Sequence, residues 1–235
     1  MAAVIRIGAS GFSYKEWLGH FYPPKLPGIK MLPYYAERLP TVEINYTFRA
    51  MPKSSMLEGW AQKTPPAFRF ALKAPQRITH FARLRETKQS LDYFINTVRA
   101  LGERLGPVLF QLPPDFGRDD QLITDFLAQI EGRVRAAFEF RNRSWFDDAV
   151  MDILRSAQAA LCITESDRIN SPVVKTADLV YMRLRKETYD EEGLAGWAQR
   201  IRSLARDSSD IYIFFKHEAA APALALRLAK LVGEV

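Results

Sequence analysis

The stretch Phe138-Glu139-Phe140-Arg141 alternates aromatic and charged residues. Successive side chains of a β-strand point to opposite faces, so this stretch predicts a strand with one aromatic face and one charged face. Such a strand fits a closed sheet whose outer face is covered by helices and whose inner face carries polar groups. The same alternation recurs in Thr41-Val42-Glu43-Ile44-Asn45-Tyr46, so more than one strand of this kind is predicted.

Outward from these two stretches, short β-branched or aromatic runs alternate with segments of helical periodicity, a pattern typical of parallel sheets with helical crossovers. The predicted strands are Val4-Ile7, Thr41-Tyr46, Phe68-Lys73, Val108-Leu112, Ala137-Arg141, Leu161-Thr164, Leu179-Leu184 and Ile211-Phe215. The predicted helices are Leu32-Leu39, Lys53-Lys63, Lys88-Arg104, Asp120-Ile130, Asp147-Gln158, a weak one at Val173-Thr176, Glu191-Ala205 and Pro222-Leu231.

Eight such units in 235 residues predict an α/β fold, a single TIM-type (β/α) barrel with parallel strands and outer helices. We expect one domain over residues 1–235, because no linker or change of composition divides the chain. The alternative is an open doubly wound sheet, which usually carries a G-x-G-x-x-G loop after its first strand. The sequence Gly8-Ala9-Ser10-Gly11 does not match that loop.

Composition narrows the function classes. The hydrophobic fraction of 48% and the aromatic fraction of 12% exclude a disordered chain, and the net charge of +6 modestly favours anionic partners. The single cysteine, Cys162, lies in an apolar run and is predicted to be a buried structural thiol. The sequence shows neither a secretory signal nor an apolar run long enough to span a membrane, so we expect a cytoplasmic protein with no membrane partner.

Strand alternation predicts which polar side chains enter the barrel, because the face toward the helices must be apolar. The predicted inward residues are Glu43, Asn45, Lys73, Gln111, Glu139, Arg141, Arg183 and Lys216, with Thr164 as a further candidate. Most stand at carboxyl ends of strands, where barrel enzymes place their chemistry. Cations outnumber carboxylates in this set, which favours a phosphate or carboxylate ligand, with Glu139 or Glu43 as acid or base. Alternatively, the two glutamates only neutralise the cations in a structural network.

Histidines and aromatic residues add candidates near the same rim. His80 and His217 follow predicted strands, and each is either a general base or an ordinary loop histidine. Tyr14 and Trp17, in a segment that also holds Phe21 and Tyr22, are predicted either to stack on a ligand or to form a local core.

No histidine or cysteine spacing typical of zinc is present, so no metal site and no cofactor are predicted. A divalent cation between Glu43 and Glu139 stays open as an alternative, with the neighbouring cations competing for those carboxylates.

Longer motifs resemble the YecE-like family, also called domain of unknown function 72, over nearly the whole chain. They are Gly8-Ala9-Ser10-Gly11-Phe12-Ser13-Tyr14 with Trp17, Tyr22-Pro23, Val42-Glu43-Ile44-Asn45-Tyr46-Thr47-Phe48, Phe70-Ala71-Leu72-Lys73-Ala74-Pro75 with Ile78-Thr79-His80, Gln111-Leu112-Pro113-Pro114 and Phe138-Glu139-Phe140-Arg141. The resemblance implies an irregular (β/α) barrel similar to endonuclease IV and the sugar isomerases, but it implies no particular activity. The histidine-rich zinc set of endonuclease IV has no counterpart here, and the chain reads Phe215-Lys216-His217-Glu218 where many members carry asparagines.

Two classes of function follow from the sequence. The first is a barrel protein that binds a small anionic ligand, and that as an enzyme would use acid/base chemistry without a metal. The second is a non-catalytic protein that binds nucleic acid through a basic rim. Positive charge gathered inside a pocket would favour the first class, and a long basic stripe across the loops would favour the second.

Overall fold

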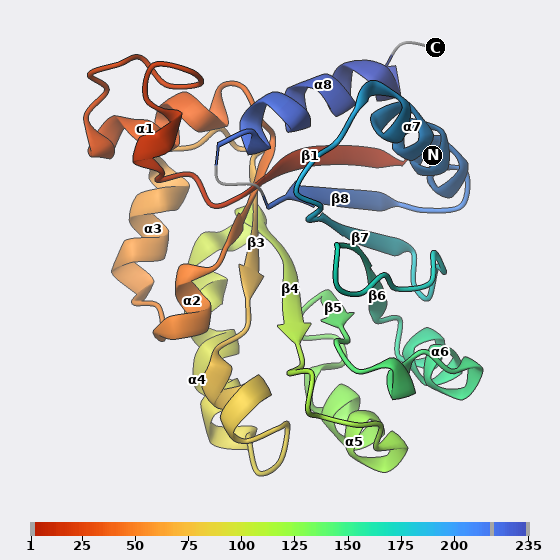
Figure 1. The fold of residues 1–235 in the computed structure, drawn as a ribbon. Coiled ribbons are helices and arrows are strands. Elements are labelled where there is room, and N and C mark those ends of the chain that lie inside the picture. Colours follow the sequence, from red (N-terminus) through yellow and green to blue (C-terminus); the bar gives the residue numbers. More distant parts are fainter. Residues whose placement is uncertain (1–2, 217–218, 234–235) are drawn as a thin grey trace.

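A computed structural model describes residues 3–216 and 219–233 of the chain. Its centre is a closed barrel of eight parallel strands in chain order, with β8 pairing to β1 (Figure 1). The strands are β1 (Val4–Ser10), β2 (Thr41–Ile44), β3 (Arg69–Lys73), β4 (Leu105–Gln111), β5 (Ala136–Glu139), β6 (Ala160–Glu165), β7 (Leu179–Leu184) and β8 (Asp210–Phe215). The predicted (β/α) barrel is therefore confirmed, and closure of the sheet rules out the open alternative.

Helices surround the barrel, and α8 packs against both α7 and β1 (Figure 1). They are α1 (Gly28–Ala36), α2 (Tyr46–Arg49), α3 (Ser54–Gln62), α4 (Lys88–Val98), α5 (Asp120–Ile130), α6 (Asp148–Ser156), α7 (Glu191–Ala205) and α8 (Ala221–Gly233). The carboxylates of Asp119, Asp147 and Asp190 accept hydrogen bonds from backbone amides in the first turns of α5, α6 and α7. These caps satisfy amides that have no partner within the helix, and so they fix where each helix begins.

The register of the strands places polar residues of neighbouring strands side by side on the inner face of the barrel. Gln111 pairs with Glu139 between β4 and β5, and Thr164 pairs with Arg183 between β6 and β7. Phe138 lies on the opposite face of β5, where its ring stacks on Phe110 at 5.3 Å between centroids. The predicted separation of an apolar outer face from a polar inner face therefore holds for these strands.

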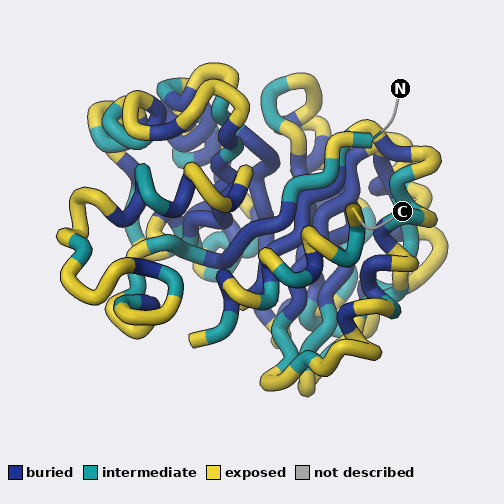
Figure 2. The backbone as a smooth tube through the Cα atoms, turned by 90° about the horizontal axis from the view of Figure 1, so that it is seen from above, coloured by how far each residue is buried: buried dark blue, intermediate teal, exposed yellow. Residues whose placement is uncertain are grey.

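The barrel interior has its own apolar core below the charged residues. Small and aromatic side chains fill it: Ala71, Leu109, Ala137, Ala160, Cys162, Ala177, Leu179, Tyr181, Tyr212 and Phe214. Burial raises the pKa of the Cys162 thiol, which keeps it uncharged. Cys162 is thus a buried thiol, as its apolar neighbours indicated. Seen from above, buried strands occupy the middle of the molecule and exposed loops surround them (Figure 2).

Several predicted elements differ from the structure, and the fifth strand, for example, ends at Glu139 and not at Arg141. Residues 173–176 form no helix, because four residues are too few to nucleate one and the Thr176 hydroxyl is bonded to Ala159 O and Leu161 N at 2.7 Å each. The predicted helix Lys88-Arg104 ends at Val98 and continues as a 3-10 segment, in which Gly102 takes a positive φ of 55°. The second strand ends at Ile44, and Tyr46 instead begins α2 with its side chain exposed.

Glycine at position 8 permits a close approach of β1 and β2. A Cβ placed there would lie 2.0 Å from the backbone oxygen of Thr41, which is far inside contact distance. Gly8 lies within β1, and its missing side chain allows the backbone of β1 to approach that of β2. Among the described residues, no helix is long and apolar enough to cross a membrane.

Candidate functional site

Arg183 lies at the centre of the charged layer, at the carboxyl end of the barrel. Its guanidinium donates from Nη2 to Glu43 Oε1 at 2.9 Å and from Nη1 to Glu139 Oε2. The three side chains come from β7, β2 and β5, which are not neighbours in the sheet. All three are at most 1% exposed, so the two ion pairs cross the inside of the barrel away from solvent.

Glu43 is held by three further donors. The hydroxyl of Ser10 on β1 and the Nδ2 amide of Asn45, at 3.2 Å, donate to Oε1, and the hydroxyl of Tyr181 donates to Oε2 at 2.7 Å. Burial alone would raise the pKa of Glu43, but Arg183 and the hydroxyl donors outweigh burial and lower it. Glu43 is therefore an anion at neutral pH.

Glu139 is surrounded by arginines. Besides Arg183, Arg141 Nε donates to Oε1 at 3.0 Å and Arg185 Nη1 donates to the same oxygen at 3.3 Å. Burial would raise the pKa of Glu139, but the three positive charges hold it far below its usual range. A carboxylate this strongly stabilised is a weak base and carries no proton to donate at neutral pH. Its role in the structure is to position three guanidinium groups, and the network of ion pairs expected as the structural alternative is present.

A second, neutral chain of hydrogen bonds starts at Lys73, at the end of β3. Lys73 Nζ donates to Gln111 Oε1 at 2.6 Å, and Gln111 Nε2 lies 3.3 Å from His80 Nε2. Because an amide nitrogen only donates, His80 Nε2 must accept, and its proton resides on Nδ1, 2.9 Å from the Thr79 hydroxyl. The structure thus assigns His80 one neutral tautomer and brings Lys73, Gln111 and His80 together as predicted for the rim.

Lys73 and His80, the two titratable groups in this series of hydrogen bonds, both have lowered pKa values, which favours their neutral forms. Burial, together with the charges of Arg183 and Arg141, lowers the pKa of Lys73 to about 7. Burial and the charges of Lys73 and Arg141 lower the pKa of His80 to about 4. At neutral pH, His80 is therefore uncharged and an appreciable fraction of Lys73 is an uncharged amine.

Lys73 lies against the ring of Phe48. Its Nζ lies 3.7 Å from the centroid of the Phe48 ring, and the Phe48 and His80 rings meet nearly at right angles with centroids 4.9 Å apart. His80 belongs to a π-helical turn, Arg77–Phe81, which is followed by three non-glycine residues with positive φ: Arg83, Leu84 and Glu86. Such backbone is costly and tends to occur where a structure fixes functional groups.

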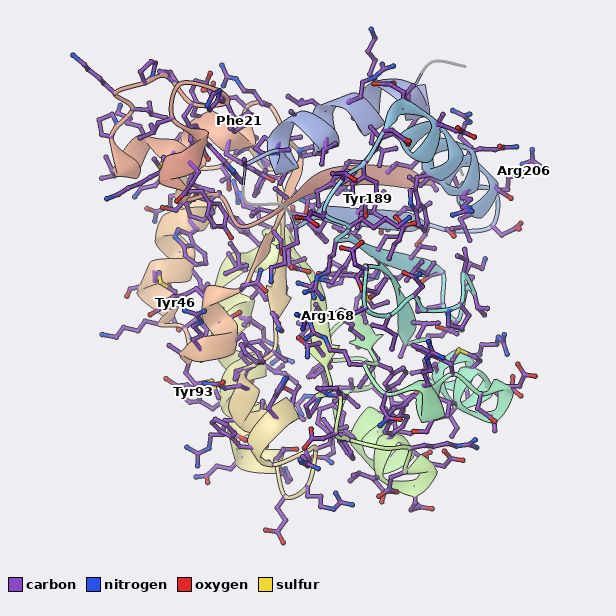
Figure 3. The ribbon with its side chains drawn as sticks, in the orientation of Figure 1. Phe21, Tyr46, Tyr93, Arg168, Tyr189 and Arg206 are labelled. Atoms are coloured by element: carbon purple, nitrogen blue, oxygen red, sulfur yellow. The ribbon has the colours of Figure 1, made fainter. Side chains whose placement is uncertain are left out.

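A cavity of about 450 Å³ opens beside the charged centre. Four arginines and one carboxylate line it, together with small and apolar residues: Pro114, Arg141, Arg143, Ser166, Asp167, Arg168, Ile169 and Arg185. Arg141 and Arg185 line the cavity while paired with Glu139. Arg143 and Arg168 lie in the segments that follow β5 and β6. In the view of Figure 3, Arg168 lies near the ends of β4 and β5. We call this space the arginine cavity.

The first loop lies on the other side of the centre. Tyr14 and Asn45 line a smaller, mostly apolar cavity of about 350 Å³ with Phe12, Tyr46 and Trp60 among its walls. Trp17, by contrast, is 1% exposed and packs between Tyr14 and Tyr22, so it belongs to the local core. Trp17 therefore offers no face to a ligand, which corrects its prediction as a ligand-binding residue.

The remaining predicted residues are less central. Lys216 directly follows β8 and is exposed, and Thr164 is buried with its hydroxyl 3.6 Å from the Cys162 sulfur. His217 lies outside the described residues. Over residues 3–216 and 219–233, no group of three or more histidine, cysteine, aspartate or glutamate side chains is arranged to hold a metal ion.

Sequence reasoning missed Arg185, Ser10, Phe48, Arg143 and Arg168. Arg185 stands two residues after Arg183 and so on the same face of the β7 extension, a signal that the alternation rule offered. Ser10 is the last residue of β1 and was missed because the predicted strand stops at Ile7. Phe48 on α2, Arg143 at the start of a 3-10 helix and Arg168 in a loop lie where period-two alternation does not apply.

A closed (β/α) barrel with a buried charged centre and a cation-lined cavity at the carboxyl ends of its strands is the class of protein that fold and site define. The chain belongs to the family described as "Protein of unknown function DUF72", whose model matches residues 6–235. This confirms the resemblance to the YecE-like family that the sequence motifs indicated.

Individual relatives agree with this membership. The chain is 24% identical over 259 residues to UPF0759 protein YunF of Bacillus subtilis, covering 94% of the chain and 91% of YunF. It is 32% identical over 144 residues to UPF0759 protein YecE of Escherichia coli, covering 61% of the chain and half of YecE.

Solved structures share the fold. The crystal structure of the DUF72 family protein TM1631 from Thermotoga maritima matches with a TM-score of 0.86 at 25% identity, covering 98% of this chain and all of that one. The DUF72 family protein EF0366 of Enterococcus faecalis matches with a TM-score of 0.82 at 19% identity, covering 99% of this chain and 96% of that one, a likeness of fold alone.

Proposed function

We propose that this chain binds a small organic anion, one that carries a phosphate or carboxylate group, in the arginine cavity. The observation that carries the proposal is the composition of that cavity, where four arginines face a single carboxylate, Asp167. Guanidinium groups donate two parallel hydrogen bonds to such anions, and these charge-assisted bonds are stronger than neutral ones. The position at the carboxyl ends of the strands is also where barrel enzymes bind their substrates.

The bonding of the cavity arginines favours this interpretation further. Arg143 and Arg168 have no carboxylate within 4.0 Å among the described residues, so their charges are available to a ligand. Arg141 and Arg185 share Glu139, which fixes their position. The sequence also predicts Arg183 to bind the ligand, but both of its Nη atoms donate hydrogen bonds to Glu43 and Glu139. We therefore assign anion binding to Arg141, Arg143, Arg168 and Arg185.

The acid/base roles change for the same reason. Glu43 and Glu139 are stabilised as anions, and we assign to them the positioning of the arginines instead of proton transfer. His80 is half-buried and uncharged at neutral pH, but its Nε2 accepts a hydrogen bond from Gln111 and its lowered pKa makes it a weak base. We therefore assign to His80 the positioning of Gln111 and, through it, of Lys73. Lys73, whose pKa is lowered to about 7, is the group of the site that can exchange a proton near neutral pH.

Charge distribution favours a small ligand over nucleic acid. The arginines of the strained rim are neutralised, since Arg83 pairs with Asp115 and Arg85 pairs with Asp119 at 3.0 Å. Two arginines without an ion pair among the described residues, Arg143 and Arg168, instead line a cavity of about 450 Å³. A nucleic-acid site would need free cations along a path several nucleotides long.

Calorimetric titration tests the proposal, starting with inorganic phosphate and a panel of phosphorylated and carboxylated metabolites. Arg168→Ala and Arg143→Ala should each weaken binding of the best ligand about tenfold or more, because each removes a charge-assisted bond. Arg206→Ala is the matched control, since Arg206 is exposed at the end of α7, far from the cavity in Figure 3. Equal affinity in all three variants would overturn the proposal.

The same titrations include duplex and single-stranded DNA and RNA at low salt. Binding that falls by about 0.9 log units per phosphate contact for each log unit of salt on duplex DNA would favour the nucleic-acid alternative. Saturable binding of a metabolite without nucleic-acid binding supports the small-ligand proposal.

A further inference from the structure

We infer that Lys73 is a carbonyl-reactive amine, which forms a Schiff base with an aldehyde or ketone group of the anion held in the arginine cavity. The inference rests on the proposed function, because it names the substrate class of the same site: a small oxo-acid or a phosphorylated aldehyde or ketone. The two are separable by experiment, as set out below.

The surroundings of Lys73 differ from those of a structural lysine. Its side chain is 7% exposed, and its Nζ has one hydrogen-bond acceptor, the neutral Gln111 Oε1. No carboxylate lies within 4.0 Å of Nζ among the described residues, since Glu43 and Glu139 are engaged with Arg183. A buried lysine that serves stability alone is normally paired with an acid.

Other cations stand close to this amine. The charges of Arg183 and Arg141 act on Lys73 and oppose its protonation, while Glu139 and Glu43 favour protonation more weakly than burial and Arg183 together disfavour it. A neutral amine is the nucleophilic form of lysine, and desolvation beside another cation is the way in which proteins obtain it. Lys73 is thus prepared for attack at neutral pH.

Arg141 connects Lys73 with the ligand. It lines the arginine cavity, and its charge lowers the pKa values of both Lys73 and His80, so it stands near all three. A ligand whose anionic group is bound by Arg141 and Arg185 would direct the next carbons of its chain toward Lys73. His80 is linked to the same amine through Gln111, whose Oε1 accepts from Lys73 and whose Nε2 donates to His80.

The chemistry balances without any further reactant. The lone pair of neutral Lys73 Nζ forms a bond to the carbonyl carbon while the carbonyl oxygen takes up a proton from solvent, and loss of a proton from nitrogen then gives a carbinolamine. Loss of water then leaves an iminium ion, whose positive charge draws electrons from the adjacent carbon. The proton that nitrogen releases protonates the leaving hydroxyl, so the net reaction takes up one solvent proton and releases one water molecule.

Borohydride trapping tests the inference directly, because hydride reduces the iminium carbon to a stable secondary amine. The full chain is incubated with pyruvate, glycolaldehyde phosphate or uncharged glycolaldehyde, reduced, digested and mapped by mass spectrometry. We expect the adduct on the peptide that holds Lys73. Its formation should increase as pH rises through about 7. Over the range from about pH 6 to 9 the neighbouring Arg183, Glu139 and Glu43 keep their charges and His80 stays neutral.

Variants give the controls. Lys73→Arg should lose the adduct, whereas Lys88→Arg, at an exposed lysine paired with Asp92, should keep it. Arg168→Ala should reduce trapping of the two anionic probes about tenfold and leave that of glycolaldehyde unchanged. Peptide mapping of the unmodified sequence needs no variant, so a failure of Lys73→Arg to fold leaves the test intact.

Each outcome decides one point. Absence of a Lys73 adduct with all three probes overturns the inference, even if calorimetry confirms anion binding and the proposed function stands. An adduct with glycolaldehyde but none with the anionic probes, together with no anion binding, overturns the anionic substrate class and the proposed function. Preferential trapping of the anionic probes at Lys73 supports both.

Discussion

Arg183 on β7 lies 2.9 Å from Glu43 on β2, and this pair joins two strands that do not touch in the sheet. With Glu139 on β5, the same guanidinium connects three separate parts of the barrel wall. The charged layer therefore contributes to the stability of the barrel, and it also supports the candidate site. It orients Arg141 and Arg185, which lead from the centre into the arginine cavity.

Removal of Arg183 should be strongly destabilising. In Arg183→Met, the Glu43 and Glu139 carboxylates stay buried without their shared cation, and loss of one member of a buried pair costs about 3 to 5 kcal/mol. Urea unfolding should show a loss of that size in the free energy of unfolding.

The matched control adds Glu43→Gln to Arg183→Met. Glu43 loses its ion pair with Arg183, so replacing Glu43 by glutamine should recover part of the stability. The double variant buries one carboxylate, Glu139, where the single variant buries two. A loss below about 1 kcal/mol in Arg183→Met would show that the ion pairs contribute little to stability.

Acid should weaken the folded state through the same two carboxylates. The folded pKa values of Glu43 and Glu139 are lowered, so the folded state binds fewer protons than the unfolded state just below pH 4.3, the usual glutamate value. Their contribution to stability is complete above that pH and is lost as pH falls further toward the folded values. Urea unfolding between pH 7 and 3 should show this loss, and Glu139→Gln should show a shallower decline.

A steric prediction concerns Gly8. Gly8→Ala places a Cβ 2.0 Å from the Thr41 backbone oxygen, so β1 and β2 must move apart, at a cost of about 1 to 3 kcal/mol. Gly28→Ala is the control, because a Cβ at Gly28, in the first turn of α1, meets no atom within 4 Å. Thermal unfolding of the two variants side by side distinguishes them, and equal stability would contradict the predicted clash.

The sequence predicts the barrel well because its signal is local. An outward Phe138 and Phe140 require an inward Glu139, and the structure buries Glu139 inside the barrel. The sequence does not predict the partners of these inward residues, because alternation gives the direction of a side chain but not the groups that it contacts. Alternation places Glu139 in the barrel, but it does not predict that Arg141, Arg183 and Arg185 converge on this carboxylate and lower its pKa.

Loop residues escape prediction for a related reason. Arg143 and Arg168 occupy segments without a hydrophobic period, so the sequence offers no indication that they share one cavity. Trp17 shows the opposite error, because an aromatic residue after a strand fits a stacking role and a local core equally well. Burial decides in favour of the core.

The protonation state of His80 is open to direct measurement. Nitrogen NMR of labelled protein should show one neutral tautomer, protonated on Nδ1, with a titration midpoint of about 4 instead of the usual 6.5. His80→Gln identifies the signal. A midpoint near 6.5 would contradict the effect of burial and of the Lys73 and Arg141 charges on His80, and a proton on Nε2 would contradict the hydrogen bond assigned to Gln111.

Lys73 should make stability depend on pH in the alkaline range. Its folded pKa of about 7 lies below the value of about 10.4 expected in the unfolded chain, so between these values the unfolded state binds more protons. The free energy of unfolding therefore rises with pH in that interval as far as Lys73 is concerned, because raising the pH removes the penalty for burying a charge.

Lys73→Met removes this titration and keeps an unbranched side chain of similar length beside Phe48. Relative to the variant, the unmodified protein should gain stability steadily between about pH 7 and 9 in urea unfolding, while Lys88→Met, at an exposed position, should follow the unmodified protein. A constant difference between Lys73→Met and the unmodified protein across this range would mean that Lys73 stays fully protonated in the fold, and the neutral amine beside Gln111 and His80 would have to be abandoned.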